Sequence, residues 1–181
     1  MGKSEHTLGT NNEWCSPQAA FKPVIDGWGK IDLDPFGNFN SRVPATKRVA
    51  LPEKWEGIPE VDAVAYRKRG YIAGDARVVP WEGIVWVNGP YDACPWWLDR
   101  SAKAADDGAE VFALAPARPN NRWWDRYVWR QATAVCWPYD RIVFEGAKYV
   151  APFHCAIIYY GHQVALFEFM YEHLGKIQRL G

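Results

Sequence analysis

One apolar run that ends abruptly constrains the fold of this chain more than any other feature. Residues 83–88, GIVWVN, carry four consecutive apolar side chains and run into Asn88-Gly89-Pro90-Tyr91. Such a short run without alternating polar residues is typical of a strand buried on both faces of a sheet. Residues 93–108 follow with apolar and small side chains at helical spacing and a terminal glycine. The sequence therefore predicts a strand followed by a helix, the unit from which parallel sheets are built.

Similar patterns along the chain predict the remaining elements. Helices are expected at 16–28, near 60–69, at 120–132 and at 163–180. Strands are expected at 30–36, 70–75, 109–117, 134–140, 141–146 and 154–161. Strands alternate with helices early and cluster late, which predicts an α/β fold with a mostly parallel sheet and antiparallel C-terminal strands. In such a sheet, ligands bind beyond the carboxyl ends of the strands.

Length and composition indicate one folded domain. The chain has 181 residues, of which 49% are hydrophobic, and its 21 basic residues balance 21 acidic ones. We expect a tail at 1–12 and a single domain at 13–181, with no membrane partner because no run of 18 apolar residues occurs. The four cysteines form no Cys-x-x-Cys pair, so reduced thiols and no metal site are expected. A neutral chain is no purely electrostatic DNA binder, although it can carry a local basic face.

The tetrapeptide Asn88-Gly89-Pro90-Tyr91 is the first candidate site. The Asn88 side chain offers a carbonyl acceptor, and Gly89 offers a backbone carbonyl beside the rigid ring of Pro90. Two such acceptors could hold both N–H groups of an exocyclic amine and turn its lone pair toward an electrophile, while Tyr91 stacks on the base. A base in a duplex has first to be flipped out. The same four residues also suit an ordinary turn, which is the competing interpretation of this stretch taken alone.

Other candidate ligand contacts lie at the ends of predicted elements. Asp32 and Asp34 belong to the strand end at 30–36, and Asp75 ends the strand at 70–75. Their carboxylates could accept hydrogen bonds from hydroxyl or ammonium groups of a ligand. Ser16-Pro17 begins a helix, where backbone amides suit a carboxylate. The competing interpretations are solvated or turn acids and a plain helix cap.

Residues 115–130, APARPNNRWWDRYVWR, interleave arginines with several of the eleven tryptophans. Arginine with aromatic residues suits phosphate contact and base stacking. The helical spacing of four places Arg122, Arg126 and Arg130 on one face. The competing interpretation is an amphipathic helix with tryptophans in the core and arginines in water, and we expect both to hold in part. The candidate nucleic-acid contacts are Arg118, Arg122, Trp123 and Arg126.

In this order, the segments resemble the phage-type DNA N-6-adenine methyltransferases, a Dam-like family of phages and prophages. The resemblance covers roughly residues 12–161 and rests on NEWCSP, GKIDLDPFG, GDARVVPW, GIVWVNGPY, VFALAPARPNNRWW, DRIVF and PFHCAIIYYG. It implies a Rossmann-like methyltransferase fold, S-adenosylmethionine as cofactor and DNA as partner. It also implies a phage or prophage origin and action in the cytoplasm of a bacterial host.

The resemblance assigns roles to the candidate residues. Family members carry Asn/Asp-Pro-Pro-Tyr at a strand end, which grips adenine N6 and stacks the flipped base, and here Asn88-Gly89-Pro90-Tyr91 stands there. Ser16-Pro17 would lie near the methionine part of the cofactor, and Asp75 would meet its adenine ring. Which acid meets the cofactor's amino group and which its ribose stays open. The implied cofactor contacts are Ser16, Pro17, Asp32, Asp34, Pro35 and Asp75.

Gly89 departs from the family, which usually has proline at this position. Glycine keeps the backbone carbonyl but lacks the rigidity that fixes its direction. The leading hypothesis is an enzyme that transfers a methyl group from S-adenosylmethionine to adenine N6 in DNA. One alternative is a catalytically impaired paralogue that binds DNA or the cofactor. Another is methylation of cytosine N4, which presents the same kind of amine.

Overall fold

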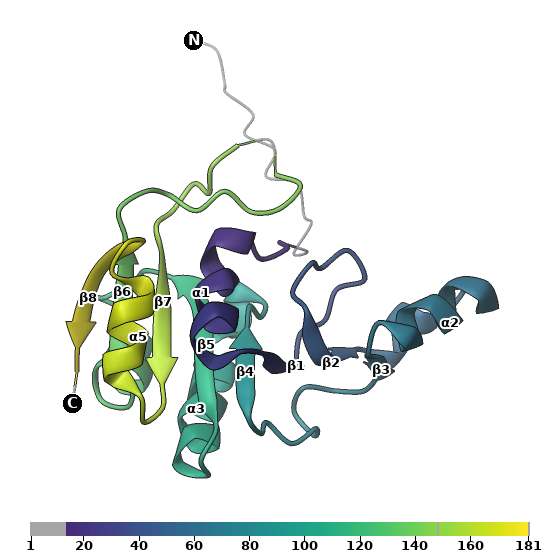
Figure 1. Ribbon diagram of the computed structural model, residues 1–181, viewed down its shortest axis with the longest axis horizontal. Coiled ribbons are helices and arrows are strands. Elements are labelled where there is room, and N and C mark those ends of the chain that lie inside the picture. The colour runs from purple at the N-terminus through teal and green to yellow at the C-terminus, as the bar shows by residue number, and fades with distance from the viewer. Residues whose placement is uncertain (1–13, 148, 181) are drawn as a thin grey trace.

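The computed structural model describes residues 14–147 and 149–180, so the predicted tail at 1–12 lies outside the described residues. Within them, eight strands form one sheet in the order β3-β2-β1-β4-β5-β7-β6-β8 (Figure 1). The strands are β1 (Ile31–Asp34), β2 (Ala45–Ala50), β3 (Tyr71–Ala73), β4 (Ile84–Val87), β5 (Glu110–Pro116), β6 (Ala134–Pro138), β7 (Cys155–Tyr160) and β8 (Gly175–Arg179). The α-helices are α1 (Gln18–Trp28), α2 (Glu60–Lys68), α3 (Cys94–Asp106), α4 (Arg122–Trp124) and α5 (Val164–Tyr171).

The strand directions divide the sheet into a parallel and an antiparallel part. β3, β2, β1, β4 and β5 pair parallel to one another. β7 pairs antiparallel with both β5 and β6, and β8 pairs antiparallel with β6. β6 therefore runs in the direction of β5, whereas β7 and β8 run against it. The predicted α/β class, with a mostly parallel sheet and antiparallel C-terminal strands, is confirmed.

Both faces of the central strands are buried, as the continuous apolar runs predicted. Trp86 and Phe112 point to the face covered by α1 and α5, whereas their neighbours Val85 and Val111 point to the face covered by α3. Because successive side chains of a strand alternate between faces, the two helical layers enclose two separate cores. The central strands, and the residues that directly follow them, are thus held in place from both faces of the sheet.

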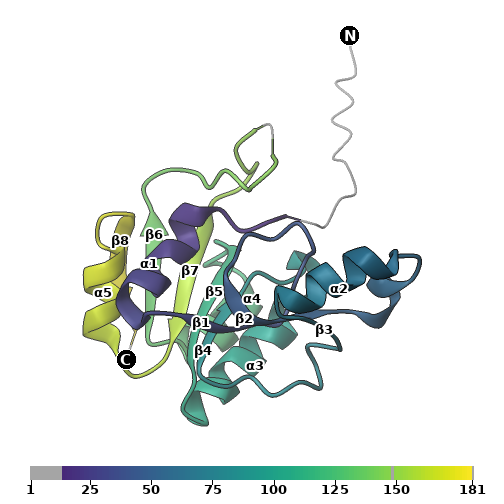
Figure 2. The same ribbon diagram turned by 45° about the vertical axis from the view of Figure 1, so that its right-hand side comes forward.

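Two helices show how the local sequence sets the geometry. α1 ends where Gly29 adopts a left-handed conformation with φ of 78° and donates its N–H to the Ile25 carbonyl at 2.8 Å. Glycine adopts this conformation without the steric cost that a Cβ adds. α2 lies beyond the β3 edge of the sheet and projects away from α1 and α5 (Figure 2).

Two predictions of secondary structure are wrong. Residues 141–146 form no strand, and their ladder is limited to one bridge between Cys15 and Glu145. Their alternating burial, with Ile142 and Phe144 inside, anchors a loop instead. The predicted helix at 163–180 ends with α5, and β8 follows. Gly175 starts β8 so close to the β6 backbone that a Cβ there would lie 2.2 Å from the Trp137 carbonyl oxygen.

A helix is present within 120–132, as predicted, but most of it is π-helical and not α-helical. α4 is followed by a π-helical turn at Asp125–Trp129. In a π-helix the backbone hydrogen bond spans five residues, and Arg130 accordingly pairs with Asp125, five positions earlier, at 2.7 Å. The spacing of four expected to align Arg122, Arg126 and Arg130 therefore does not describe this segment.

Candidate functional site

The candidate site lies where the strand order of the sheet reverses. From β1 the chain continues outward to β2 and β3 on one side, then returns to β4 and β5 on the other. Ligands of open α/β sheets bind in the crevice at such a switch point, beyond the carboxyl ends of the strands. A cavity of about 480 Å³ occupies this place. Its lining includes residues that follow β1, β2, β3 and β4, namely Pro35, Phe36, Asn38, Leu51, Lys54, Asp75, Arg77 and Asn88.

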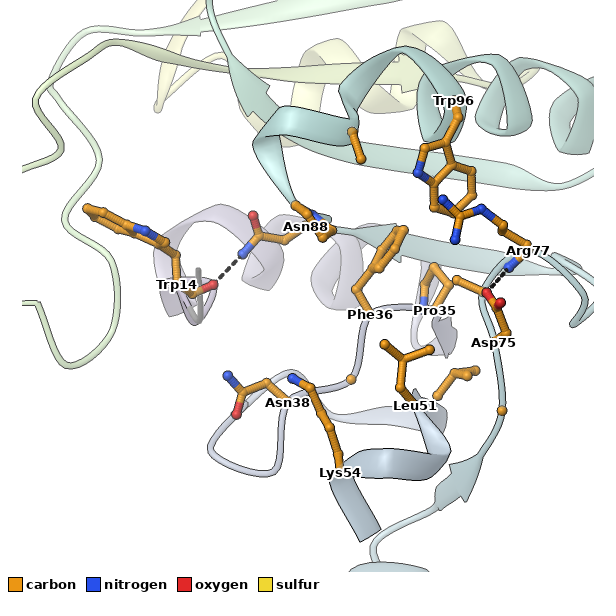
Figure 3. Close-up of a pocket in the computed structure, with 16 residues that line it drawn as sticks. Trp14, Pro35, Phe36, Asn38, Leu51, Lys54, Asp75, Arg77, Asn88 and Trp96 are labelled. Atoms are coloured by element: carbon orange, nitrogen blue, oxygen red, sulfur yellow. Dashed lines mark hydrogen bonds between the residues drawn. The ribbon is translucent and has the colours of Figure 1, made fainter. Parts of the chain in front are cut away.

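The cavity has apolar walls and a few polar groups. Phe36 and Trp96 supply aromatic surface, and Leu51 faces them from the β2 side (Figure 3). The Arg77 guanidinium lies 4.8 Å from the centre of the Trp96 ring, and the Asp75 carboxylate accepts a 2.8 Å hydrogen bond from the backbone N–H of Arg77. An apolar pocket with a few placed polar groups is the usual form of a small-molecule site.

Asn88 is held in one orientation by the segment that precedes α1. Its Nδ2 donates a 2.7 Å hydrogen bond to the backbone carbonyl of Trp14 (Figure 3). A carbonyl oxygen only accepts, so the amide nitrogen must face Trp14, and the Oδ1 acceptor points to the other side. There it lies 3.4 Å from the Tyr91 hydroxyl. A small hollow of about 30 Å³ adjoins these groups, lined by Trp14, Asn88, Gly89, Pro90 and Tyr91.

Tyr91 stands in an aromatic cluster with Trp14, Phe144 and Phe153. Its ring centre lies 5.6 Å from that of Phe153 and 6.2 Å from that of Phe144, both in edge contacts. Trp14 contacts Phe144 at 4.8 Å, also edge to face. Burial of the hydroxyl, which lies beside Cys155, raises the pKa of Tyr91 well above its ordinary value. Tyr91 is therefore a neutral hydrogen-bond donor at physiological pH.

Gly89 is confined by two aromatic side chains. A Cβ at this position would lie 2.9 Å from Phe36 Cε2 and 2.9 Å from Trp97 Nε1, closer than side-chain atoms approach one another. Trp97 Nε1 also donates a 2.9 Å hydrogen bond to the carbonyl of Pro90. Trp97 thus fixes the carbonyl of Pro90, and the Phe36 and Trp97 rings leave no room for a side chain at position 89.

The two acids of β1 have different surroundings. Asp34 is buried, accepts a 3.0 Å hydrogen bond from the Phe36 N–H and stands opposite Arg48 of β2. Burial raises the pKa of Asp34 to about 6. Asp32 instead accepts a 2.9 Å hydrogen bond from the Ile84 N–H at the start of β4 and pairs with Lys30. Neither carboxylate lines the cavity, whereas the next residue, Pro35, does.

Ser16 and Pro17 also lie outside the cavity lining. The buried Ser16 hydroxyl accepts a 2.9 Å hydrogen bond from Trp86 Nε1, and Pro17 precedes the first turn of α1 in an extended conformation. Their neighbour Trp14 lines both the cavity and the small hollow. The structure thus brings Asp75, Pro35, Asn88 and Pro90 together, and leaves Ser16, Pro17, Asp32 and Asp34 to contacts within the fold.

The arginine and tryptophan segment lies after β5, at the same edge of the sheet. Trp124 is fully buried, Trp123 is half-buried, and Arg122 is exposed. Arg118 is exposed as well and lies close enough to Cys94 to affect its titration, although burial still raises the pKa of Cys94 to about 12. The exposed Arg126 lies over the Tyr127 ring at 5.2 Å. Arg118, Arg122, Trp123 and Arg126 are all outside the cavity lining.

Sequence reasoning missed several residues that line the cavity. Phe36 and Arg77 belong to the motifs DPFGNF and GDARVV, so their neighbours were already candidates. Lys54 and Leu51 follow β2, a strand that the charged stretch at 38–70 concealed. A strand signal at 45–50 could have identified both, because its carboxyl end belongs to the same edge.

A scan against protein-family models finds no family that matches the chain, and no curated protein matches it either. Among the helices of residues 14–147 and 149–180, none is both long and apolar enough to cross a membrane. In the same part of the chain, no group of three or more His, Cys, Asp and Glu side chains is arranged to hold a metal ion.

Proposed function

We propose that this chain is a DNA methyltransferase that transfers a methyl group from S-adenosylmethionine to adenine N6. The orientation of Asn88 carries the proposal. The Trp14 carbonyl holds the amide nitrogen at 2.7 Å, which presents Oδ1 as an acceptor beyond β4 and beside a cavity at the switch point. An amide acceptor at this place suits an exocyclic amine.

The residues that line the cavity fit S-adenosylmethionine. A volume of about 480 Å³ is ample for a ligand of this size. Phe36 and Trp96 offer aromatic surface to the adenine ring, and the Asp75 carboxylate offers an acceptor to its polar edge. The bound cofactor supplies an activated methyl group on a positively charged sulfur. The mostly parallel sheet with antiparallel C-terminal strands also supports the Rossmann-like fold that the resemblance implies.

The residues of the tetrapeptide would orient the acceptor amine. Asn88 Oδ1 and the Gly89 carbonyl accept the two N–H groups of a flipped adenine, which turns the nitrogen lone pair toward the cavity. Tyr91 offers a ring for stacking, and its hydroxyl stays protonated. An amine that accepts a methyl group is positively charged until it releases one of its protons to solvent, and the two carbonyl acceptors would stabilise that charge. The same proposal places the protein with DNA in a bacterial cytoplasm, encoded by a phage or prophage.

Labelled S-adenosylmethionine and duplex DNA test the proposal. We expect wild-type protein to label DNA and Asn88→Ala to be slower by about 100-fold or more, since one preorganised polar group is lost. Asn40→Ala is the matched control, because Asn40 is an exposed asparagine outside the cavity. DNA labelling by Asn88→Ala at the wild-type rate contradicts the proposal, as does a folded wild-type protein that labels no DNA.

Cofactor binding is measured separately by equilibrium dialysis of labelled S-adenosylmethionine. Asp75→Ala should weaken binding by at least about tenfold, because a charged hydrogen-bond acceptor of the cavity is removed. Asp106→Ala removes an exposed carboxylate of α3 and should leave the dissociation constant unchanged. Equal affinities for wild type and Asp75→Ala would remove Asp75 from the cofactor site.

The two alternative functions differ in what supports them. Gly89 is the feature that favours an impaired paralogue, but a Cβ at this position would collide with Phe36 and Trp97, which gives the glycine a packing reason. Cytosine N4 offers the same kind of amine to Asn88, and no contact described above favours either base. Mass analysis of the labelled nucleoside separates the two bases.

A further inference from the structure

The loop that joins β6 to β7 is placed beside the candidate site by the topology of the sheet. β6 runs parallel to β5, and β7 runs against both. β6 therefore ends, and β7 begins, at the edge where β4 presents Asn88. The described part of this β6–β7 loop comprises residues 139–147 and 149–154, and it rises from that edge near the start of α1 (Figure 1).

The base of the β6–β7 loop is anchored against the small hollow. Phe144 is buried and contacts the rings of Trp14 and Tyr91. Phe153 contacts Tyr91 from the other end of the loop, with ring centres 5.6 Å apart. The Glu145 N–H donates a 3.0 Å hydrogen bond to the Cys15 carbonyl. The loop therefore packs against Trp14 and Tyr91, two of the residues that line the hollow.

The β6–β7 loop also carries exposed apolar side chains. Val143 and Val150 are each 49% exposed, and Tyr149 is 73% exposed. Burial of apolar surface is what normally stabilises such side chains, and loops of this length without secondary structure are usually functional. The charges around them balance, because the exposed Arg141 follows the exposed Asp140 and Arg42 is paired with Glu145 at 2.8 Å. Exposed apolar side chains that follow the edge of the sheet where Asn88 lies fit DNA whose base stack is open.

The hollow is small in this structure. Its volume of about 30 Å³ holds about two water molecules, which is less than a base needs. A base that enters this hollow would have to displace Trp14 or Tyr91, and the β6–β7 loop packs against both. Contact between the loop and DNA would thus be coupled to the capture of the base.

We propose that the β6–β7 loop inserts Val143, Tyr149 and Val150 into the duplex at the position that the flipped adenine leaves. This inference rests on the proposed function. Flipping costs a few kcal/mol of pairing and stacking, and apolar side chains that enter an opened base step offset part of that cost. The loop would therefore matter for duplex DNA and little for single strands, whose bases are already free.

A triple variant, Val143→Ser with Tyr149→Ser and Val150→Ser, tests the loop. The first readout is the fluorescence of a random-sequence duplex in which 2-aminopurine replaces part of the adenine, since unstacking increases its emission. Wild-type protein should increase the emission, and the triple variant should lose most of that increase at saturating protein. This readout needs no methyl transfer, so it separates failure of the loop from failure of the proposed enzyme.

The second readout compares methylation of a duplex with that of its heat-denatured strands. The triple variant should lose at least about tenfold in rate on the duplex and stay within about threefold of wild type on single strands. Phe169→Ser is the control, because Phe169 is 70% exposed on α5, outside this loop. The single variant Tyr149→Ser takes the place of the triple variant if the triple variant does not fold. Thermal unfolding shows whether each variant is folded.

Several outcomes would overturn the proposal. They are wild-type emission from the triple variant, an equal loss on duplex and single strands, and an unchanged duplex rate. A wild-type protein that associates through this surface, with a triple variant that sediments as a monomer, would instead assign the loop to contact between copies of the chain.

Discussion

Gly89 is held between Phe36 and Trp97, and this packing defines what its position tolerates. A Cβ there would lie 2.9 Å from an atom of each aromatic ring. The carbonyl of the next residue, Pro90, is fixed by Trp97 Nε1 at 2.9 Å. The expectation that glycine makes the tetrapeptide less rigid follows only from the backbone freedom of glycine. It could not include Phe36, which follows a different strand and is brought to Gly89 by the fold.

Substitution of Gly89 should destabilise the protein. Gly89→Ala and Gly89→Pro are each expected to lower the free energy of unfolding by about 1–3 kcal/mol, because they overpack a filled site. In a Phe36→Ala background the cost of Gly89→Ala should be smaller, since one of the two obstructing rings is gone. Denaturant unfolding of the four proteins of this cycle measures the coupling. An equal cost of Gly89→Ala in both backgrounds would show that Phe36 does not confine Gly89.

Asp34 should give the stability of the protein a specific pH dependence. Burial raises its pKa to about 6 from the ordinary value of 3.8, so the folded state binds this proton more tightly than the unfolded state. The contribution to stability is greatest below about pH 4 and is lost as the pH rises through 6. Relative to Asp34→Asn, wild type should lose about 3 kcal/mol of unfolding free energy across this range.

Denaturant unfolding of both proteins at several pH values checks the prediction for Asp34. Asp106→Asn, which changes an exposed acid, is the control and should follow wild type. A difference between wild type and Asp34→Asn that stays constant from pH 4 to pH 7 would contradict it.

At the scale of elements, the buried central strands and the edge strand β3 were predictable, whereas β2 and β8 were not. β4, β5 and β7 are continuous apolar runs because helices cover both of their faces. The sequence of β2 looks like a charged, exposed segment because it contains Arg48. In the fold, however, Arg48 is buried and donates a 2.8 Å hydrogen bond to the Val43 carbonyl. β8 lies at the edge with three exposed polar side chains, so no apolar pattern marks it.

The start of β8 depends on a close approach of two backbones. Gly175→Ala should lower the free energy of unfolding by at least about 2 kcal/mol, because a Cβ 2.2 Å from the Trp137 carbonyl oxygen forces β8 away from β6. Lys176→Ala, on an exposed neighbour, should have little effect. Denaturant midpoints measure both variants. An unchanged midpoint for Gly175→Ala would mean that β8 contributes little to stability.

The whole molecule assembles its candidate site from segments that are distant in the sequence. The general location was predictable, since the carboxyl ends of parallel strands share one edge. The identity of the contacts was not, because Trp14, Phe36 and Lys54 reach the cavity through loops whose course the sequence pattern does not define. Asn88 and Asp75 were predicted and do line the cavity. Their roles in binding and catalysis stay predictions.

The nucleoside composition of cellular DNA tests the central claim most directly. The chain and its Asn88→Ala variant are expressed in a bacterial host without adenine methylation, and the digested DNA is analysed by mass. We predict N6-methyladenine in DNA from cells with the wild-type chain, and about 100-fold less or none with Asn88→Ala. Folded wild-type protein that leaves DNA unmodified, or that yields N4-methylcytosine alone, would contradict the assignment of this site to adenine N6.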